Sequence, residues 1–447
     1  MSLFVTFSAS CAVVWLARAV LRLYFHPLST YPGSRIAAIA PSWYEWYWNY
    51  YHNGELIFEI ERQHSALGPV VRIGVNELHI NDPEIFLEMT KAGSKFTKVS
   101  KLYSVISFPG TSIGFIDPTG HCIRRQVLTP AFSPARVREL APMIQNKVNT
   151  LVQRIQTTNA AHPKTPLDAF TFDLISTIVL GQDFKCVGHP LYKNEFVEQL
   201  HKAFDMGWTW TAFPNLTRLS MMLPDWLSKT VFPIPILFFK EAYQNRLHEW
   251  TQDPGMMRSV VIDMLMDPNL SKDHSVLTPQ QLNDEVIMLL TAGNDTTSNS
   301  MILGIYQICR NPAVYERLQK ELLAQFPHKY AEIDLEDCKR LPYLNAFIRE
   351  VLRFSSPIPG RLPRIVPSEG FRLYDKLLPS GIVLHTSAYM LNRHSEVWAN
   401  PHVFDYLMFA NLFCRFDVAI YDTLDVDIQW IDLILSCSKL RIDFRDI

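Results

Sequence analysis

A short polar cluster interrupts an otherwise apolar stretch, and its residue types are those that move protons. It runs from Ala292 to Thr297 and contains Asp295 and Thr296. The apolar flanks predict a buried helix, so both polar side chains need hydrogen-bond partners. Two interpretations are open. Either a threonine hydroxyl bonds back to the preceding turn at a bend, or a widened turn lies beside a cofactor and the two side chains pass protons or hold water.

A second group of charged residues lies about 50 positions further along the chain. Glu350 and Arg353 stand three residues apart among apolar neighbours, which predicts a buried ion pair whose hydrogen bonds must nearly all be satisfied. Arg361 and Arg364 then lie on a proline-rich extended segment. Two forked guanidinium groups there suit a bidentate anion such as a carboxylate.

The elements that position these residues are mostly helices. Residues 133–355 read as helical, with one helix starting at Ser133 and Pro134 and a long one starting after Thr278 and ending before Asn311. Two short strands are expected in 68–82, joined at 74–76, and two more in 371–389, around 379–381. The predicted fold class is mainly α with small β-sheets.

The N-terminus is apolar and uncharged from Leu3 to Ala17, and Arg18 and Arg22 follow. With the next residues this segment reaches the roughly 20 positions needed to span a bilayer. We expect a membrane anchor at 1–22, a proline-rich hinge at 23–34 and a single body at 35–447. The basic residues place the body in the cytosol. A buried N-terminal helix is the alternative interpretation.

Composition excludes several classes of protein. The 447-residue chain has a net charge of −2 and a pI near 6.7, so nucleic acid is not an expected partner. Its seven cysteines form no C-x-x-C pair and no regular framework, which argues against zinc and structural disulfides and for a reducing compartment.

Taken in order, these stretches resemble the cytochrome P450 family. The resemblance rests on the 292–297 cluster, the E-x-x-R motif of Glu350 and Arg353, the R-L-P-R run at 361–364, the segment 121–137 ("HCIRRQVLTPAFSPARV") and the N-terminal anchor with its hinge. It covers nearly the whole chain up to Asp405 and resumes afterwards. It is nearest to membrane-bound fungal members, including trichodiene-oxygenase-like ones, and implies the cytochrome P450 fold.

The resemblance also implies a b-type haem and roles for particular residues. Asp295 and Thr296 are the implied catalytic residues, managing protons for dioxygen cleavage. The implied haem-binding residues are Ala292 and Gly293 at the oxygen groove, which Asn294 helps to open, and His121, Arg125 and Arg364 at the propionates. Glu350 and Arg353 are implied to be structural. Electrons come in the family from a membrane-bound NADPH-dependent cytochrome P450 reductase, at the endoplasmic reticulum membrane.

One part of the family pattern is missing. The iron is held in the family by a cysteine in a loop of the form F-x-x-G-x-R-x-C-x-G, where the thiolate pushes charge onto the metal. Cys186 precedes the central helix, Cys437 has no glycine nearby, and Cys414 lies in a stretch that resembles the family's segment after this loop. Asp405 runs directly into Tyr406. We therefore predict an internal deletion of some tens of residues there, no metal ligand, and a fold incomplete on its proximal side, including the lost third partner of Glu350 and Arg353.

Three interpretations of the chain compete. In the first it is a cytochrome P450 that has lost its haem-ligand segment and cannot perform normal monooxygenation. In the second it is an active oxidoreductase that uses Cys414 or a histidine as a substitute ligand. In the third it is a non-catalytic relative that binds a lipophile or a partner at the membrane. The first is favoured, because Cys414 lies inside a predicted helix with no glycine-rich turn to expose its sulfur, and a buried neutral thiol is a poor ligand.

The stretches that line the substrate pocket in this family carry no charges here. They are 104–115 and 356–360, with an aromatic stretch at 205–216 that is expected to face the membrane or the access channel. We expect a small lipophilic substrate such as a terpenoid or polyketide intermediate.

Overall fold

The computed structural model describes most of the chain. The described residues are 2–106, 108–158, 164–193, 197–198, 212–213, 215, 224, 260–271, 273–328 and 333–398, with the backbone of four strands at 416–420, 429–430, 435–436 and 442–446. The Asp405–Tyr406 junction, Cys414, Cys437 and most of 205–216 lie outside them. The protein is mainly helical with small β-sheets, as the sequence predicts.

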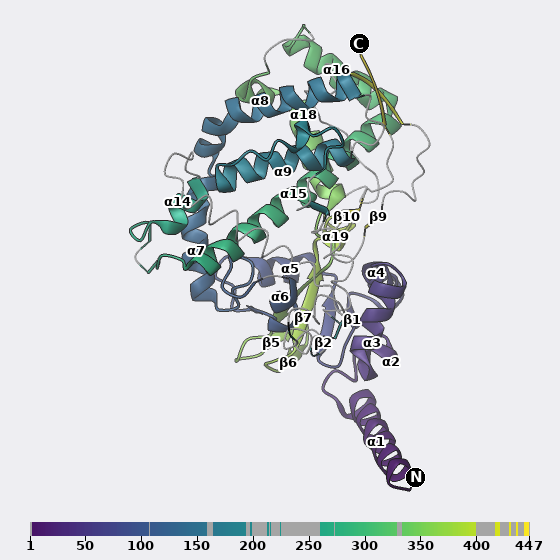
Figure 1. Cartoon of the computed structure of the whole chain (residues 1–447). Helices are drawn as coiled ribbons and strands as arrows, with labels where there is room; N and C mark the ends of the chain where they lie inside the picture. The colour runs from purple at the N-terminus through teal and green to yellow at the C-terminus, as the bar shows by residue number, and fades with distance from the viewer. Residues whose placement is uncertain are drawn as a thin grey trace.

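The larger half of the body is a group of packed helices (Figure 1). Its centre is α15 (Pro279–Arg310), which packs against α9 (Lys164–Leu180) and α18 (Pro342–Ser355). The surrounding helices are α7 (Pro118–Leu128), η3 (Thr129–Phe132), α8 (Pro134–Thr158), η4 (Cys186–Gly188), α14 (Val260–Met266), α16 (Pro312–Gln325) and α17 (Leu335–Arg340). Their apolar faces form the main hydrophobic core of the molecule.

The ends of α15 are those that the sequence predicts. The Thr278 hydroxyl accepts a hydrogen bond from the Gln281 backbone N–H at 3.3 Å, and the Thr278 N–H donates to Gln281 Oε1 at 3.0 Å. Pro279 takes the first helical position, where no backbone donor is needed. The helix ends before Asn311 and Pro312.

A five-stranded sheet forms the smaller half, with the strand order β1-β2-β7-β4-β3. Its strands are β1 (Val70–Arg72), β2 (Glu77–Ile80), β7 (Val383–Ser387), β4 (Arg361–Ile365) and β3 (Thr97–Lys98). The purple N-terminal strands therefore lie beside yellow-green strands from far along the chain (Figure 1). The helices around the sheet are α2 (Arg35–Ile39), α3 (Pro41–Trp46), η2 (Tyr47–Tyr51), α4 (Leu56–Leu67), α5 (Pro83–Thr90), α6 (Ser100–Ile106) and α19 (Ala388–Leu391).

One prediction for this sheet needs correction. We expected two strands to pair around 379–381, but the segment contains three. β5 (Phe371–Leu373) pairs with β6 (Lys376–Leu378) through a tight turn in which Tyr374 has a φ of +52°, while β7 leaves to join β2 and β4. The described C-terminal strands are β8 (Phe416–Ile420), β9 (Gln429–Trp430), β10 (Leu435–Ser436) and β11 (Ile442–Asp446). They form two antiparallel pairs.

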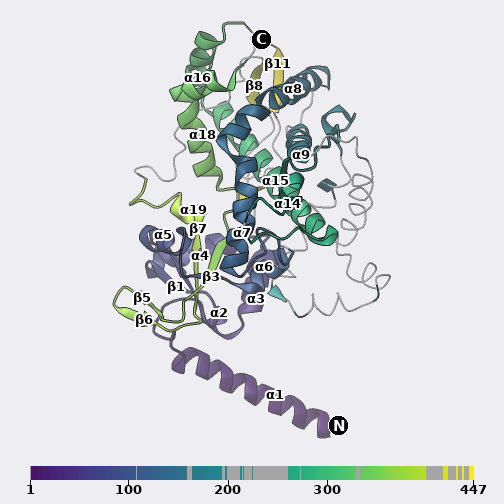
Figure 2. The same cartoon turned by 90° about the vertical axis from the view of Figure 1, so that its left-hand side faces the viewer.

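The N-terminal helix projects away from the body. Figure 2 shows α1 (Ser2–Val20) extending from one end of the molecule. It continues into the π-helical turn η1 (Leu21–Phe25), and the apolar span Val5–Phe25 is 21 residues long and 6% buried. This helix is long and apolar enough to cross a membrane. The alternative of a buried N-terminal helix is wrong for the described residues.

The segment between α1 and α2 is seated on the sheet. Gly33, with a φ of +152°, forms a parallel bridge with Arg72 of β1, and the Arg72 N–H donates to the Pro32 carbonyl at 2.6 Å. A Cβ on Gly33 would come within 2.2 Å of the Arg72 carbonyl oxygen, so only glycine fits. The expected hinge at 23–34 is thus fixed to the body at this end.

Candidate functional site: the distal helix and a group of unpaired cations

The polar cluster in α15 forms a regular α-helix. The Thr296 hydroxyl donates to the Ala292 carbonyl at 2.7 Å, and the helix stays α-helical throughout the cluster. The back-bonded threonine is therefore present, whereas the bend and the widened turn are not found in this helix. Thr296 is half-buried and Asp295 is 2% exposed.

Much of the cluster joins α15 to α9, a role that the sequence analysis missed. The Thr171 hydroxyl of α9 donates to Asn294 Oδ1 at 2.7 Å, and the Ser298 hydroxyl donates to Asp168 Oδ1 at 2.5 Å. The Asn294 amide also donates to Asp295 Oδ1 at 3.5 Å. Polar residues of this kind in a buried helix are explained by polar partners across the interface.

Close packing against α9 explains the glycine at position 293. A Cβ at this position would lie 2.7 Å from Cγ1 of Ile175 in α9. The two helices therefore approach closely here because one residue has no side chain. Whether Gly293 and Ala292 also border an oxygen groove stays a prediction.

Four basic side chains gather where α7 meets the edge of the sheet. Lys98 of β3 is directly opposite Arg364 of β4, while His121 and Arg125 come from α7. Sequence analysis named the last three and missed Lys98. We call these four residues the cation cluster.

The pKa values record how closely these groups lie. Burial lowers the pKa of Lys98 to about 8, and the charges of Arg364 and Arg125 add to the effect. Burial also lowers the pKa of His121, helped by Lys98 and the same two arginines. For both side chains the protonated form is disfavoured, first by burial and then by the positive charge of the neighbouring groups.

The cation cluster has neutral partners only. Arg364 donates to the Tyr103 hydroxyl at 2.9 Å, and Lys98 donates to the Ile113 carbonyl at 2.9 Å. Among the described residues, no carboxylate lies within 4.0 Å of a charged nitrogen of the cluster. Because like charges this close repel one another, the half-buried cluster is suited to a ligand with more than one negative charge.

The prediction that Arg361 and Arg364 together bind one anion is wrong for Arg361. Side chains alternate along a strand, so residues three apart on β4 lie on opposite faces. Arg361 donates to Glu45 Oε1 at 2.7 Å and is neutralised inside the protein. Only Arg364 is left to meet an anion.

A second buried ion pair was missed by the sequence analysis. Glu285 of α15 is fully buried and receives hydrogen bonds from Arg124 Nη1 and from the Ser112 backbone N–H, the latter at 2.9 Å to Oε2. It ties α15 to α7 and to the loop before α7. Arg124 stands beside Arg125 in sequence but is buried, whereas Arg125 is exposed. No local signal distinguishes the two.

The predicted pair of Glu350 and Arg353 is present and buried. Arg353 donates from Nε and Nη2 to the two carboxylate oxygens at 2.6 and 2.5 Å, and from Nη1 to the Asn392 carbonyl at 2.6 Å. Arg393 lies beside it and donates to the Phe354 carbonyl at 2.8 Å. Burial lowers the pKa of Arg393 to about 10, and the nearby charge of Arg353 contributes to the shift.

The described residues fit one end of a haem group and not its centre. The cation cluster matches the two carboxylates of the propionates, which are the charged part of the group. In the cytochrome P450 pattern the iron is held by a cysteine thiolate in a loop that follows the E-x-x-R helix, which is α18 here. The cysteines in the described part of the chain, namely Cys11, Cys122, Cys186, Cys309 and Cys338, all precede it. Burial raises the pKa of Cys338 to about 11, which keeps that thiol protonated.

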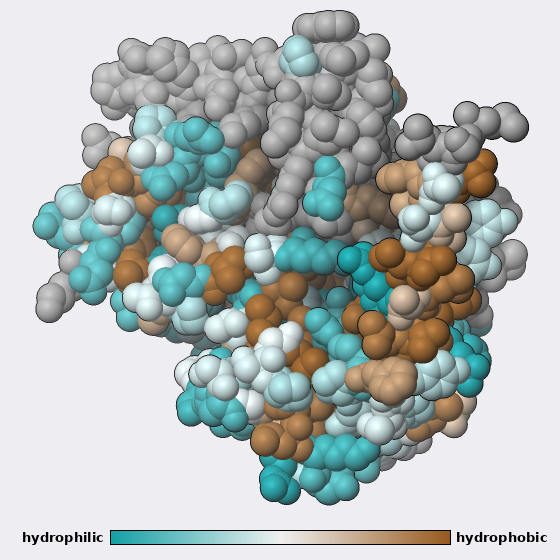
Figure 3. All heavy atoms as spheres, turned by 90° about the horizontal axis from the view of Figure 1, so that it is seen from below, coloured by the Kyte–Doolittle hydropathy of each residue, from teal (hydrophilic) through white to brown (hydrophobic). Residues whose placement is uncertain are grey.

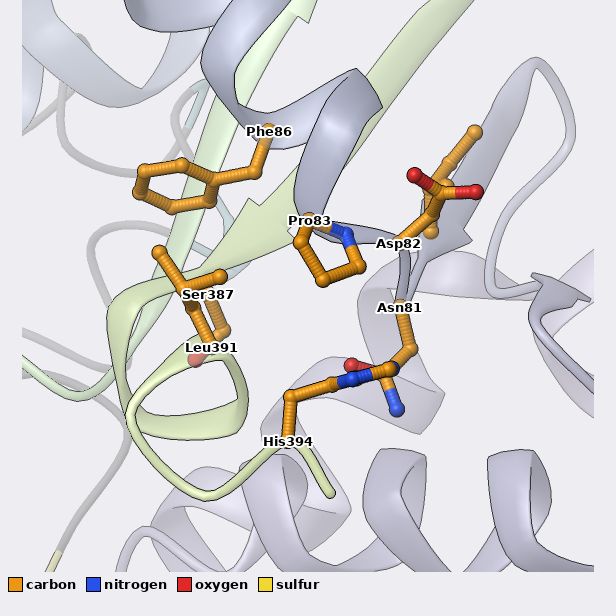
Figure 4. Close-up of a pocket in the computed structure, with 8 residues that line it drawn as sticks. Asn81, Asp82, Pro83, Phe86, Ser387, Leu391 and His394 are labelled. Carbon is orange, nitrogen blue, oxygen red and sulfur yellow. The ribbon is translucent and has the colours of Figure 1, made fainter. Parts of the chain in front are cut away.

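A small cavity elsewhere carries no comparable chemistry. It has a volume of about 10 Å³ and lies between the start of α5 and the end of β7 with α19 (Figure 4). Its carboxylate, Asp82, already accepts from the Glu84 and Ile85 backbone N–H groups and from the Tyr374 hydroxyl. The space is a packing gap beside a helix cap.

The family comparison agrees with this geometry. The model of the cytochrome P450 family matches residues 40–412, which is most of the chain. The chain belongs to the cytochrome P450 family, and the predicted fold is confirmed. The crystal structure of a cytochrome P450 (CYP102L1) has the same fold, with a TM-score of 0.71 at 13% identity over 88% of this chain and 95% of that one.

The similar sequences are fungal P450 monooxygenases. Cytochrome P450 monooxygenase sol6 of Alternaria solani is 50% identical over 88% of this chain and 86% of its own length. Cytochrome P450 monooxygenase macH of Penicillium terrestre is 28% identical over 97% of this chain and 95% of its own. Conidiogenone synthase PchP450 of Penicillium rubens is 29% identical over 89% and 80%.

Proposed function

We propose that this chain is a fungal cytochrome P450 of secondary metabolism that lacks the thiolate ligand and does not carry out normal monooxygenation as it stands. In the family, haem held by a cysteine thiolate activates dioxygen for insertion of an oxygen atom into the substrate. The reaction of intact relatives on which we base the proposal is oxidation of a lipophile such as a terpenoid or polyketide.

The observation that carries the proposal is the direct junction of Asp405 and Tyr406. No F-x-x-G-x-R-x-C-x-G pattern follows Arg353 in the sequence. Alignment lengths support a gap: the match to the Penicillium terrestre relative runs over 487 positions, which exceeds the 447 residues of the chain by 40. That relative therefore contains residues with no counterpart here.

The residues of the other half of the site support the proposal. In the proposal, Arg364, Arg125, Lys98 and His121 hold the propionate carboxylates, and burial of the cluster strengthens these contacts. Thr296 and Asp295 lie on α15, where the Thr296 hydroxyl keeps a donor bond to the Ala292 carbonyl and its oxygen remains free to accept. These residues position a ligand and a proton, but without the thiolate they have no iron chemistry to serve.

The membrane setting belongs to the same proposal. The apolar span Val5–Phe25 anchors the chain once in the endoplasmic reticulum membrane, residues 23–34 connect it to the body, and residues 35–447 face the cytosol. NADPH-cytochrome P450 reductase is the expected electron donor of an intact relative.

The alternative function is a non-catalytic protein that binds a lipophile or a partner at the membrane. The observation in its favour is that α15 and the cation cluster are folded, although the sequence has no haem-ligand segment. Substitution of Cys414 for the lost ligand is the remaining alternative, and the same experiment tests it.

The test is a carbon monoxide difference spectrum of the purified full chain after incubation with haem and reduction. We expect no thiolate-type Soret band. A chimera that carries the segment of the Penicillium terrestre relative aligned between Asp405 and Tyr406 should gain the band, which controls for folding. A band in the parent that disappears in Cys414→Ala and persists in Cys437→Ala would overturn the proposal in favour of a substitute ligand.

The two haemless outcomes are separated by a second measurement. Lipophile binding is followed by quenching of intrinsic tryptophan fluorescence with a brominated fatty acid as the probe. Saturable quenching without a Soret band supports the non-catalytic binding protein, and its absence supports a chain that has simply lost its activity.

A further inference from the structure

A second cavity lies where the N-terminal helix meets the body. It has a volume of about 290 Å³ and is lined by η1, by the segment after it, by the start of α2 and by β1. Its polar wall consists of Tyr24, Ser29, Tyr31, Arg35 and Arg72. This volume is at the lower end of those that hold small ligands.

The cavity wall carries positive charge that no acid among the described residues neutralises. Arg72 is 4% exposed, and its guanidinium donates to the carbonyls of Gly74, Arg22 and Val75 at 3.1, 2.9 and 3.0 Å. Burial lowers the pKa of Arg72, and the charge of Arg22 lowers it further.

The remaining guanidinium groups have no carboxylate either. Arg22 donates to the Ile39 carbonyl at 2.6 Å. Arg35 is exposed at the mouth and has no hydrogen-bond or ion-pair partner within the described part of the chain. Arg35 and Arg72 line the cavity and Arg22 lies next to it in sequence, and none of the three has a carboxylate partner among the described residues, so the cavity favours an anion.

One acid acts on the cavity wall, and it has a cation beside it. Asp375 acts on Tyr31, whose pKa is raised by burial and then by this carboxylate. The adjacent Lys376 places its ammonium nitrogen 4.9 Å from the centre of the Tyr31 ring. The two charges offset each other, so the arginines determine the sign of the cavity.

The position of the cavity selects the kind of anion. It lies directly after the apolar span Val5–Phe25, at the level of lipid headgroups when that span crosses a bilayer. Figure 3 looks at this end of the molecule and shows hydrophobic residues gathered in patches among hydrophilic ones. Ile36 and Trp43, in the helices next to the cavity, are 64% and 61% exposed. Exposed aromatic and basic residues together are typical of a membrane interface.

We propose that this cavity binds the headgroup phosphate of an anionic phospholipid, with Arg35 as the contacting side chain at its mouth and Arg72 as the buried charge behind it. The lipid's acyl chains lie along α1. The proposal rests on the membrane anchorage proposed above, and it does not depend on haem.

The test measures binding of dihexanoyl phosphatidylserine to the full chain in neutral detergent by isothermal titration calorimetry. Dihexanoyl phosphatidylcholine and inorganic phosphate are the comparison ligands. We expect saturable binding of phosphatidylserine, at least about fivefold weaker binding of the other two, and a loss of about fivefold in Arg35→Gln. Arg138→Gln, an exposed arginine on α8, is the matched control and should bind as the parent does.

Three results would overturn the inference. They are equal binding of the two lipids, inorganic phosphate binding as tightly as phosphatidylserine, and unchanged binding in Arg35→Gln. Arg35 makes no contact that folding needs, so a weakened variant with an unchanged thermal transition reports the cavity alone. Because no haem signal is read, failure here leaves the proposed loss of the thiolate untouched, and the reverse also holds.

Discussion

Two sets of arginines in this protein differ in what neutralises them. Arg124 and Arg353 are each bound to a buried carboxylate, whereas Arg364 and Arg125 face other cations and neutral groups. In the first set the charges are paired inside the protein, and removing one partner would leave an uncompensated buried charge. The second set has no carboxylate partner among the described residues, so an anion is the partner that it would accept. The difference separates residues that build the molecule from residues that await a ligand.

The largest effect is expected at the fully buried pair. Glu285→Gln leaves the buried Arg124 without its carboxylate, and we expect the free energy of unfolding to fall by about 3 to 5 kcal/mol. Urea denaturation of the full chain in detergent measures it. Glu139→Gln, from an exposed pair with Arg136, is the control and should change nothing measurable. A loss at Glu285 as small as that at Glu139 would show that the two classes of arginine do not differ.

A smaller loss is expected on the proximal side. Glu350→Gln leaves Arg353 with its bond to the Asn392 carbonyl and with the Trp398 ring 5.0 Å from its guanidinium. We expect the free energy of unfolding to fall by about 2 to 3 kcal/mol, as for loss of charged hydrogen bonds. The same denaturation series measures it. A loss equal to that of Glu285→Gln would mean that this network is as complete as the distal one.

Strand β4 contains one arginine of each kind, Arg361 with a carboxylate partner and Arg364 without one. Arg361→Gln removes a partner of Glu45, which keeps Lys101 at 3.5 Å, and should lower the free energy of unfolding by about 1 to 2 kcal/mol. Arg364→Gln removes a cation from a repulsive cluster, so stability should be unchanged or slightly higher. Thermal denaturation of both variants measures the two effects. Equal losses of stability would contradict the assignment of Arg364 to a ligand.

The smallest effect is a pH dependence. The folded-state pKa of Lys98 is about 8, below its ordinary value of 10.5, so the unfolded chain binds more protons between these values. The free energy of unfolding should therefore rise with pH through this window. Below pH 8 the cost of holding the charged Lys98 in the fold should be fully present. For a side chain that is only half-buried we expect about 1 kcal/mol. Urea denaturation at pH 7 and pH 10 measures the rise, and Lys98→Met should remove it. A rise that persists in this variant would mean that another group causes the pH dependence.

Local signals predicted the elements well. The ends of α15 follow from Thr278, Pro279 and Pro312, each of which acts on its own neighbours, and the E-x-x-R pair lies within one helix. The pairing of Glu285 with Arg124 spans 161 residues and could not be predicted, because only the fold brings them together. The error at Arg361 has a similar cause: its partner Glu45 lies 316 residues away.

The strand segments show the same limit. Residues 371–389 carry a turn signal at 379–381, which correctly marks a break between strands. Which strands then pair depends on the partners β2 and β4, far along the chain. The missed role of Asn294 also has a distant cause, since its partner Thr171 lies in α9.

The bridge between Gly33 and Arg72 has a mechanical consequence. It makes the segment after α1 the outermost rung of a ladder of hydrogen bonds that crosses β1, β2, β7, β4 and β3. Arg364 lies four strand spacings from Gly33 and Lys98 lies five, which is about 19 and about 24 Å at the usual spacing of about 4.8 Å. Any displacement of the segment after α1 therefore passes through the hydrogen bonds of one sheet before it reaches those two residues.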